Sequence, residues 1–505
     1  MLPAQTTAST RAGRREWAAL VVLMLPVLLV SIDNTVLGFA LPAIASDLQP
    51  SASAQLWIVD VYPLVLAGLL VTMGTLGDRW GRRRLLLIGA SGFAVVSALA
   101  AFAPSAEALI AARIALGFFG ATLMPSTLSL LRSLFLDDAQ RRLAIAVWAT
   151  GFAAGSAIGP LVGGVLLEHF PWGSVFLVAV PVLLPLLVLA PLLIPESRDP
   201  QPGRIDPTGI ALSMIALTPI VYAIKRVATE GFDLVAAGLI LVGLAAGVLF
   251  VRRMNRRPDP MLDIALFRRP RFSGAVLVNL VSVVSLVGFL YFLTQHLQLI
   301  VGLSPLDAAL TLTPGIVVMI ASGLLVVPIS RRLRPGSVIA VALLISGSGY
   351  VVTGLTGQSG EVLPLVIAFS LLGMGIGAAE TLSNDMIIGS VTPDKAGAAS
   401  GVSETAYELG AVLGTAVLGS IITAVYRGEL AIPAGVPVAD ATAARETLAG
   451  AVEVAASLPG DTGRALLESA QHAFDSGAVA ISIVGAVLIV GASVLAAVTL
   501  RAPRE

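Results

Sequence analysis

The chain contains no cysteine and only two lysines, Lys225 and Lys395, in 505 residues. Without cysteine it can form neither a disulfide framework nor a thiolate metal site. Neither lysine follows a glycine, so a Walker A phosphate loop is excluded, and no H-E-x-x-H zinc motif is present. We therefore expect no metal, no cofactor, no enzymatic activity and no ATP site of the chain's own.

Charged residues are also scarce, at 12% of the chain, whereas 56% of the residues are hydrophobic. A soluble domain carries about 25% charged residues. The mean hydropathy of +0.93 agrees with a chain that lies largely within a membrane. The 31 basic and 31 acidic residues cancel, and no nucleic-acid partner is expected. The composition predicts an all-α polytopic membrane protein.

Fourteen stretches of about 18 or more mostly apolar residues are long enough to cross a bilayer. They run over 17–42, 55–76, 84–102, 106–131, 142–167, 173–194, 208–226, 233–251, 273–298, 304–329, 336–356, 361–389, 396–426 and 477–500. An even number of spans places both chain ends on the same side of the membrane.

Most of the 31 basic residues fall in connections on the side of the chain ends, for example Arg79, Arg252 and Arg331. Lys225 and Arg226 are among the few that we assign to the other side. Because cytoplasmic loops are enriched in Lys and Arg, we expect both termini in the cytoplasm and the protein in a bacterial inner (plasma) membrane. The three histidines, His169, His296 and His472, fall in or beside outer regions and are predicted as surface residues.

The loops divide the chain into two six-helix bundles, 1–195 and 273–505, joined by a linker, 196–272, that holds two additional spans. The glycine-rich fifth and thirteenth spans indicate weak internal symmetry between the halves. Two related halves around a midplane cavity are the architecture of a secondary transporter. The second bundle includes a long outer loop, 427–476, whose pattern predicts short amphipathic helices lying over the outer face.

Acidic side chains lie inside the apolar spans, namely Asp33, Asp60, Glu380, Glu404 and Glu408. A carboxylate at membrane depth costs about 2.5–3.5 kcal/mol on insertion scales, and such groups usually face a bundle interior or a water-filled cavity. We predict that these acids bind substrate or protons, with fixed interhelical hydrogen bonds as the alternative. For Glu380 and for Asp385, near the cytoplasmic end of the same span, a gate or structural role is as strongly expected as transport.

Glu404 and Glu408 are four residues apart and therefore share one face of the thirteenth span. A proton and an organic cation can compete for a site made by two such carboxylates. Tyr407 lies near the same face and adds an aromatic wall, which favours a cation. A non-transporting receptor or scaffold would not need two intramembrane carboxylates at this spacing.

The connection after the second span carries the run Gly74-Thr75-Leu76-Gly77-Asp78-Arg79-Trp80-Gly81-Arg82-Arg83-Arg84. The glycines allow a tight turn, and the charges can form a network that latches the two halves on the cytoplasmic side. Asp137 and Asp138 are candidate partners for the arginines. The alternative is a basic loop that only sets topology, but such a loop needs neither the aspartate nor the glycine spacing. We predict a cytoplasmic gate made by Gly74, Asp78, Arg79, Gly81, Arg82 and Arg83.

Two further motifs lie within spans. Glycines recur every four residues in the fifth span and keep one helix face smooth for close packing, together with Pro160. The members of this motif are Gly155, Gly159, Pro160, Gly163 and Gly164. Arg113, in the fourth span, is a buried cation that needs a carboxylate partner, either a static one or one whose separation from Arg113 changes with proton binding.

These motifs resemble those of the major facilitator superfamily. The run from Gly74 matches its G-x-L-x-D-R-x-G-R-[RK] signature, and Arg113 begins its R-x-x-x-G-x-x-G pattern, which is linked to proton coupling. The run Gly155 to Gly164 resembles the motif of its antiporters. Asp33-Asn34-Thr35-Val36, followed by Ala40-Leu41-Pro42, is similar to a pattern of the 14-helix drug:proton antiporter branch, although Ser403 stands where some of these pumps carry a further acid.

The resemblance implies the major facilitator fold, with two six-helix bundles and two additional helices. It also implies export of lipophilic organic cations, such as quaternary ammonium compounds, ethidium and fluoroquinolones, by a monomer that uses the proton gradient. Asp33 and Arg113 would then couple proton movement to transport. A same-fold exporter of a metabolite or lipid is the alternative.

Overall fold

The computed structural model describes residues 11–198, 206–257, 260, 264–356, 361–390 and 396–500, and within them it contains helices and no strand. Thirteen helical segments of the described residues are long and apolar enough to cross a membrane. Helix α5 (Asp138–His169), with 32 residues, stands at the place of the fifth predicted span. The predicted all-helical membrane fold is therefore confirmed. Helices are the expected result because backbone groups inside a bilayer must be satisfied within their own segment.

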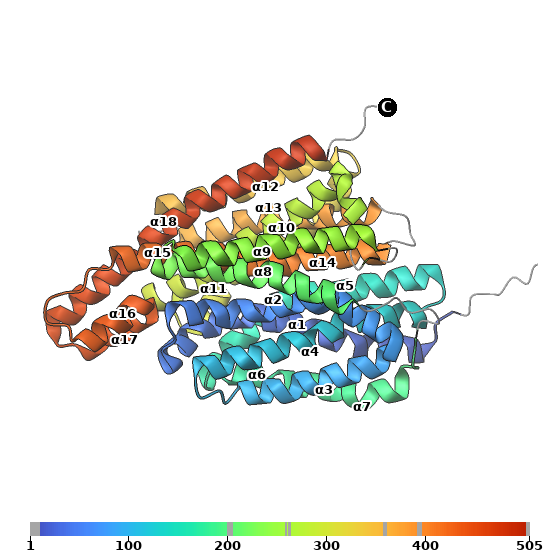
Figure 1. Ribbon diagram of the computed structural model, residues 1–505, viewed down its shortest axis with the longest axis horizontal. Coiled ribbons are helices and arrows are strands. Elements are labelled where there is room, and N and C mark those ends of the chain that lie inside the picture. The colour runs from blue at the N-terminus through green and yellow to red at the C-terminus, as the bar shows by residue number, and fades with distance from the viewer. Residues whose placement is uncertain are drawn as a thin grey trace, which may run out of the picture.

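The first bundle is formed by the helices before residue 194. They are α1 (Arg14–Leu48), α2 (Ala52–Trp80), α3 (Arg82–Ala100), α4 (Ala106–Leu134), α5, and the broken pair α6 (Ser174–Leu177) and α7 (Ala179–Leu193). Serine side chains begin two of them, since Ser51 and Ser105 accept hydrogen bonds from the amides of Ala54 and Ala108. Figure 1 shows this bundle in the lower part of the molecule.

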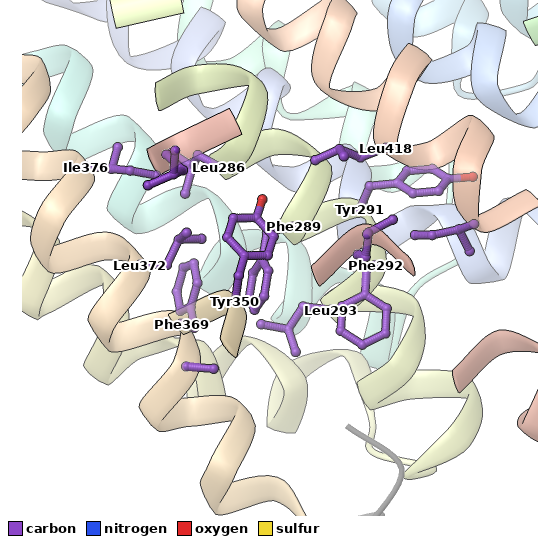
Figure 2. Close-up of a cluster of buried hydrophobic side chains, with 14 of the residues drawn as sticks. Leu286, Phe289, Tyr291, Phe292, Leu293, Tyr350, Phe369, Leu372, Ile376 and Leu418 are labelled. Atoms are coloured by element: carbon purple, nitrogen blue, oxygen red, sulfur yellow. The ribbon is translucent and has the colours of Figure 1, made fainter. Parts of the chain in front are cut away.

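The second bundle follows residue 264. It contains η1 (Ile264–Arg268), α10 (Pro270–Gln295), η2 (His296–Ile300), α11 (Pro305–Ser330), α12 (Pro335–Thr356), α13 (Val362–Gly389), α14 (Ala396–Leu413), η4 (Gly414–Gly419), α15 (Ser420–Glu429) and α18 (Gly460–Thr499). Its buried side chains include an aromatic group in which Phe289 contacts Tyr350 edge-on, with ring centroids 5.4 Å apart, and stacks on Phe369 at 6.3 Å (Figure 2).

Two additional helices, α8 (Pro207–Glu230) and α9 (Leu234–Arg256), form a hairpin between the bundles in Figure 1. Only 17% of the membrane-length window of each helix is buried, so the hairpin lies at the periphery with most of its apolar surface facing outward. One side of α8 nevertheless packs against α2 of the first bundle and against η4 and α15 of the second.

The outer loop predicted at 427–476 is shorter than expected. Helix α15 continues to Glu429, α16 (Val438–Glu446) and α17 (Leu448–Ser457) form a short helical pair, and α18 begins at Gly460, 17 residues before the predicted span. Short helices are therefore present in the predicted loop, but its residues from Gly460 onward belong to the first turns of α18. This pair projects at the left of Figure 1, opposite the end of α18.

The two bundles are hydrogen-bonded to each other at the end that holds α16 and α17. We call this the hairpin end, after α16 and α17 and not after the α8–α9 hairpin. The end that holds the starts of α1 and α10 is called the terminal end. Five hydrogen bonds cross between the bundles here: Gln49 Nε2 to Glu453 (3.2 Å), the Ala52 amide to Glu446 (2.8 Å), Gln55 to Gln295 (3.2 Å), Gln298 to the Phe39 carbonyl (3.2 Å) and Ser304 to Glu168 (3.2 Å). The hairpin end is therefore closed in this structure.

At the terminal end, Asp206 holds the two additional helices together. Its carboxylate caps α8 through the amide of Gly209 (3.0 Å) and lies 2.7 Å from Arg253 and 2.6 Å from Arg257. The hydrogen bond from Arg253, followed by those from Gly209 and Arg257, holds the pKa of Asp206 well below its ordinary value despite burial. A carboxyl group of this kind stabilises the folded state in its ionised form.

The interaction of Asp206 with Arg253 and Arg257 can be tested by measuring stability at two pH values. We expect Asp206→Asn to lower the opening free energy of the α8–α9 hairpin by about 1–3 kcal/mol at pH 7, because Arg253 and Arg257 lose their acceptor. The folded-state pKa is depressed, so this contribution is present above the ordinary carboxyl pKa, about 3.9, and is lost as the pH falls through the folded-state value. Hydrogen–deuterium exchange of residues 207–256 should show the difference between wild type and variant shrinking below about pH 4. A difference that widens with acid would contradict this account.

Candidate functional site

A central cavity of about 440 Å³ lies between the bundles. Its wall is mostly apolar and is formed by α1, α2, α4 and α5 on one side and by α10, α11, α13, α14 and η4 on the other. The polar and charged side chains that line it include Asn34, Asp60, Arg113, Glu380, Tyr407 and Thr415. Leu286, Tyr291 and Phe369, which belong to the buried hydrophobic cluster in Figure 2, also line the cavity. A large apolar chamber with a few converging polar groups is the usual form of a small-molecule site.

Asp33 and Arg113 form a buried ion pair at this wall. The Arg113 Nη1 lies 2.7 Å from Asp33 Oδ2, and the side chains are 2% and 7% exposed. Arg113 also donates from Nε to the carbonyl of Ile58 (3.2 Å), and its guanidinium lies 4.5 Å from the centre of the Tyr62 ring. The pair joins α4 to α1 and α2, with Arg113 on the cavity surface. The predicted carboxylate partner of Arg113 is thus identified, whereas its role in proton coupling stays a prediction.

Asp60 lines the cavity and is paired with a residue that the sequence analysis placed elsewhere. Lys225, assigned to the outer side at the end of the predicted span 208–226, is instead 1% exposed within α8, and its Nζ lies 2.9 Å from Asp60 Oδ2. That assignment was wrong because α8 extends to Glu230, so Lys225 is still inside the helix and its side chain points inward. Its neighbour Arg226 points outward and binds Asp233 (2.9 Å).

The acids of α14 have no such counterions. Glu408 is buried, and neither of its carboxylate oxygens has a hydrogen-bond partner within the described part of the chain. Glu404, one turn earlier, is half-buried, and Tyr407 between them reaches the cavity wall. Asn34 and Asp33 of α1 and Tyr62 of α2 are groups of the first bundle that lie near Glu408. The predicted pair therefore lies next to the cavity at the junction between the bundles, without lining it.

The acids of α13 differ from each other. Glu380 lines the cavity, and its Oε1 has no hydrogen-bond partner among the described residues. Asp385 is exposed, five residues nearer the terminal end. Over the described ranges, the cavity acids of the second bundle form no ion pair, whereas both acids of the first bundle are paired with a base. The cavity is thus electrically asymmetric.

The glycine motif of α5 packs against α1 beside Asp33. A Cβ at Gly155 would lie 2.7 Å from Ser31 Cβ, and one at Gly163 would meet the Val36 side chain. Gly159 faces Ile32 and Thr35 in the same way, and Pro160 lines the cavity. Gly164 faces the second bundle instead, where a Cβ would lie 2.8 Å from Leu306 Cα. Close packing is therefore a function of these glycines, and the proposed part in antiport stays a prediction.

The predicted gate motif turns the chain between α2 and α3. Gly81 has φ of 113°, which favours glycine, and Asp78 binds Arg82 (2.8 Å). The carboxylate of Glu196 accepts hydrogen bonds from the amides of Arg83 (3.0 Å) and Arg84 (3.1 Å).

The observed partners of the motif include residues that were not predicted. Arg82 donates to the Ser197 hydroxyl, and Arg83 donates to the Ile194 carbonyl (2.8 Å). Asp137 caps α5 through the amide of Gln140, and the side chain of Asp138 lies outside the described residues. The segment after α7 was not foreseen as a partner. Gly74 packs near Pro125, and Arg79 is exposed. A latch between the two halves stays a prediction.

One histidine was placed wrongly. His296 is 1% exposed at the start of η2, with Nδ1 3.4 Å from Asp475 and its ring 5.3 Å from that of Phe292. The early start of α18 explains this burial, since it carries Asp475 over the end of α10. His169 and His472 are exposed, as predicted.

A bundle of membrane-length helices around a central cavity defines a polytopic membrane transporter. The chain belongs to the Major Facilitator Superfamily, whose sequence profile matches residues 23–415. It is therefore a transporter and not an enzyme.

Relatives cover nearly the whole chain. It is 55% identical to the multidrug efflux pump LfrA of Mycolicibacterium smegmatis over 98% of each sequence. It is 35% identical to the methyl viologen resistance protein SmvA of Salmonella typhimurium, over 94% of this chain and 96% of that one. The fold is similar to the crystal structure of a bacterial homolog of the human lysosomal transporter Spinster, with a TM-score of 0.66, 18% identity and coverage of 98% and 100%.

Proposed function

We propose that this protein exports lipophilic organic cations in exchange for protons. The observation that carries the proposal is the cavity, an apolar chamber of about 440 Å³ in which the carboxylate of Glu380 has no counterion among the described residues and Tyr407 offers an aromatic face. A lipophilic cation can bind there in two ways. Its apolar surface is removed from water by the cavity wall, and its positive charge interacts with a carboxylate and an aromatic ring. The efflux and resistance functions named for the relatives support the same substrate class.

The proton would be carried by acids near the cavity. An unpaired anion is costly in an apolar interior, so we infer that Glu408, which is buried without a partner among the described residues, holds a proton in this state. Glu404, one turn away, connects it to the less buried part of α14. Asp33 would take part when its separation from Arg113 changes. We further propose that Asp60, Glu380 and Tyr407 form the substrate-facing side of this site.

We propose that the terminal end faces the cytoplasm of a bacterial cell, because the arginine-rich connections lie at that end. The described state, closed at the hairpin end, would then be one that takes up substrate from the inside. Alternating access requires the five hydrogen bonds across the hairpin end to break when the protein opens outward. The protein would act as a monomer.

A transport assay with reconstituted protein tests the proposal. We expect Glu404→Gln/Glu408→Gln to slow proton-driven ethidium movement at least about tenfold, which corresponds to the loss of about 1.4 kcal/mol of coupling. Glu468→Gln, the same chemical change at an exposed position of α18, should retain the wild-type rate. A protonophore should abolish the wild-type signal. Proteoliposomes that move ethidium equally well with both acids replaced would refute the roles given to them.

A further inference from the structure

The additional helix α8 places a cation against the wall of the cavity. On one side of α8, Val221 is buried together with Leu64 of α2 and with Val412 and Ala416 of the second bundle. Lys225 follows Val221 by four residues and so lies on the same face, directed into this contact. The helix is otherwise peripheral, so its buried lysine is its main polar contribution to the interior of the described structure.

The surroundings of the Lys225 ammonium group resemble a binding site for an organic cation. Its ammonium lies 2.9 Å from the carboxylate of Asp60 and 3.8 Å from the centre of the Trp57 ring, and the Trp57 ring stacks on Tyr222 at 6.2 Å. A carboxylate and the face of a tryptophan are the two groups that hold ammonium ligands in proteins. The side chains of Lys225 and Asp60 are 1% and 0% exposed, so solvent screens their interaction little.

The position of Lys225 decides how much negative charge a substrate meets. Asp60 lines the cavity, whereas Lys225 and Trp57 lie behind it. A cation in the cavity therefore approaches a carboxylate whose charge is already compensated from the other side. Asp33 is compensated by Arg113 as well, and in this pair the base lies on the cavity side. What remains uncompensated among the described cavity acids is Glu380 of the second bundle, with Glu404 and Glu408 beside it.

We propose that Lys225 is a specificity-determining residue, a tethered cation that neutralises Asp60 and thereby restricts the cavity to substrates with a single positive charge. This inference rests on the proposed function, since it concerns the same cavity. Discrimination between ligands is often achieved by a repulsive element against the unwanted one. A dication bound near Glu380 brings its second charge toward the first bundle, whose described residues offer two neutral ion pairs and no free carboxylate at the cavity. The sequence motifs give no role to the additional helices, and this proposal supplies one.

The test compares two dyes of one chemical family, ethidium with one positive charge and propidium with two. Their binding to purified protein in detergent is measured by fluorescence. We expect wild type to prefer ethidium. Lys225→Met keeps the aliphatic stem over Trp57 but leaves the Asp60 carboxyl free to ionise when a second positive charge approaches it, so propidium affinity should rise about tenfold and ethidium affinity at most about threefold. Lys225→Arg, which keeps the positive charge, should keep the wild-type preference.

Each outcome separates this inference from the proposed function. Failure of wild type to bind either dye would refute the proposed substrate class. If wild type binds ethidium, but Lys225→Met leaves propidium affinity unchanged or changes both affinities by the same factor, only the role of Lys225 would be overturned.

If Lys225→Met does not fold, Asp60→Asn/Lys225→Met removes both charges and provides the decisive ratio. We expect the ratio of propidium to ethidium affinity to match wild type, because the pair is neutral in both proteins. A tenfold fall in this ratio would mean that Asp60 already serves dications in wild type, and the inference would be wrong.

Discussion

Replacement of Arg113 by methionine is expected to reduce ethidium transport at least about tenfold and to destabilise the protein by about 3–5 kcal/mol, the usual cost of breaking a buried ion pair. Arg113 is the counterion of Asp33 at 2.7 Å, and both side chains are almost fully buried. Methionine fills a similar volume but leaves the carboxylate without its cation in an apolar interior. The Ile58 carbonyl and the Tyr62 ring lose their partner as well. Thermal unfolding in detergent and transport in proteoliposomes measure the two effects.

Two further variants separate charge from geometry at this pair. Arg113→Lys keeps the charge but loses the planar fork, so it should recover part of the stability and less of the transport. Asp33→Asn/Arg113→Met removes both charges, so it should recover stability but not transport. If Arg113→Met were as stable as wild type, the ion pair would not be fixing α4 to α1. If the double variant transported normally, the pair would have no part in proton coupling.

Substitution of Gly155 by alanine is expected to cost about 1–3 kcal/mol of stability, as overpacking of a close interface does. A Cβ at Gly155 would lie 2.8 Å from the carbonyl oxygen of Leu28 and 2.7 Å from Ser31 Cβ. A backbone carbonyl cannot rotate away as a flexible side chain can, so α5 must move off α1. Because Asp33 follows Ser31 by two residues, the displacement reaches the ion pair, and transport should fall along with the unfolding temperature.

Gly151 provides the matched control on the same face of α5. Its Cβ would meet the terminal methyl of Met24 at 3.2 Å, the end of a flexible side chain that can give way. Gly151→Ala should therefore change stability by no more than about 0.5 kcal/mol, as substitutions away from rigid contacts do. Equal losses in the two variants would show that a general effect of the added methyl group matters more than the close contact with Leu28.

The positions of the spans could be predicted because the membrane makes a simple demand on the sequence. A run of apolar residues must be long enough to cross, and the arginine-rich connections mark where it ends. The prediction was wrong by 17 residues at α18, since the first turns of this helix lie outside the apolar run. The pattern of apolar residues in such amphipathic turns is the same in a separate short helix and in the extension of a longer helix.

Single acids and bases in the spans could be located from the sequence, but their partners could not all be identified. The need of Arg113 for a carboxylate was evident, and Asp33 meets it. Lys225 was misplaced because it stands beside Arg226 near the end of an apolar run, where a pair of basic residues suggests a loop. Two adjacent residues on a helix point about 100° apart, so one of them can face inward. Asp60, an intramembrane acid at a similar depth for which the sequence analysis proposed no basic partner, was the available signal that Lys225 faces inward.

The closed hairpin end also has an energetic consequence. Five hydrogen bonds join the bundles there, and at a net worth of about 0.5–1.5 kcal/mol each their loss costs on the order of 2.5–7.5 kcal/mol. One elementary charge falling through 100 mV releases about 2.3 kcal/mol, so a few protons in an energised membrane would match this cost. Without a membrane potential the same bonds would keep the hairpin end closed, so the protein would not become an open channel for its substrates.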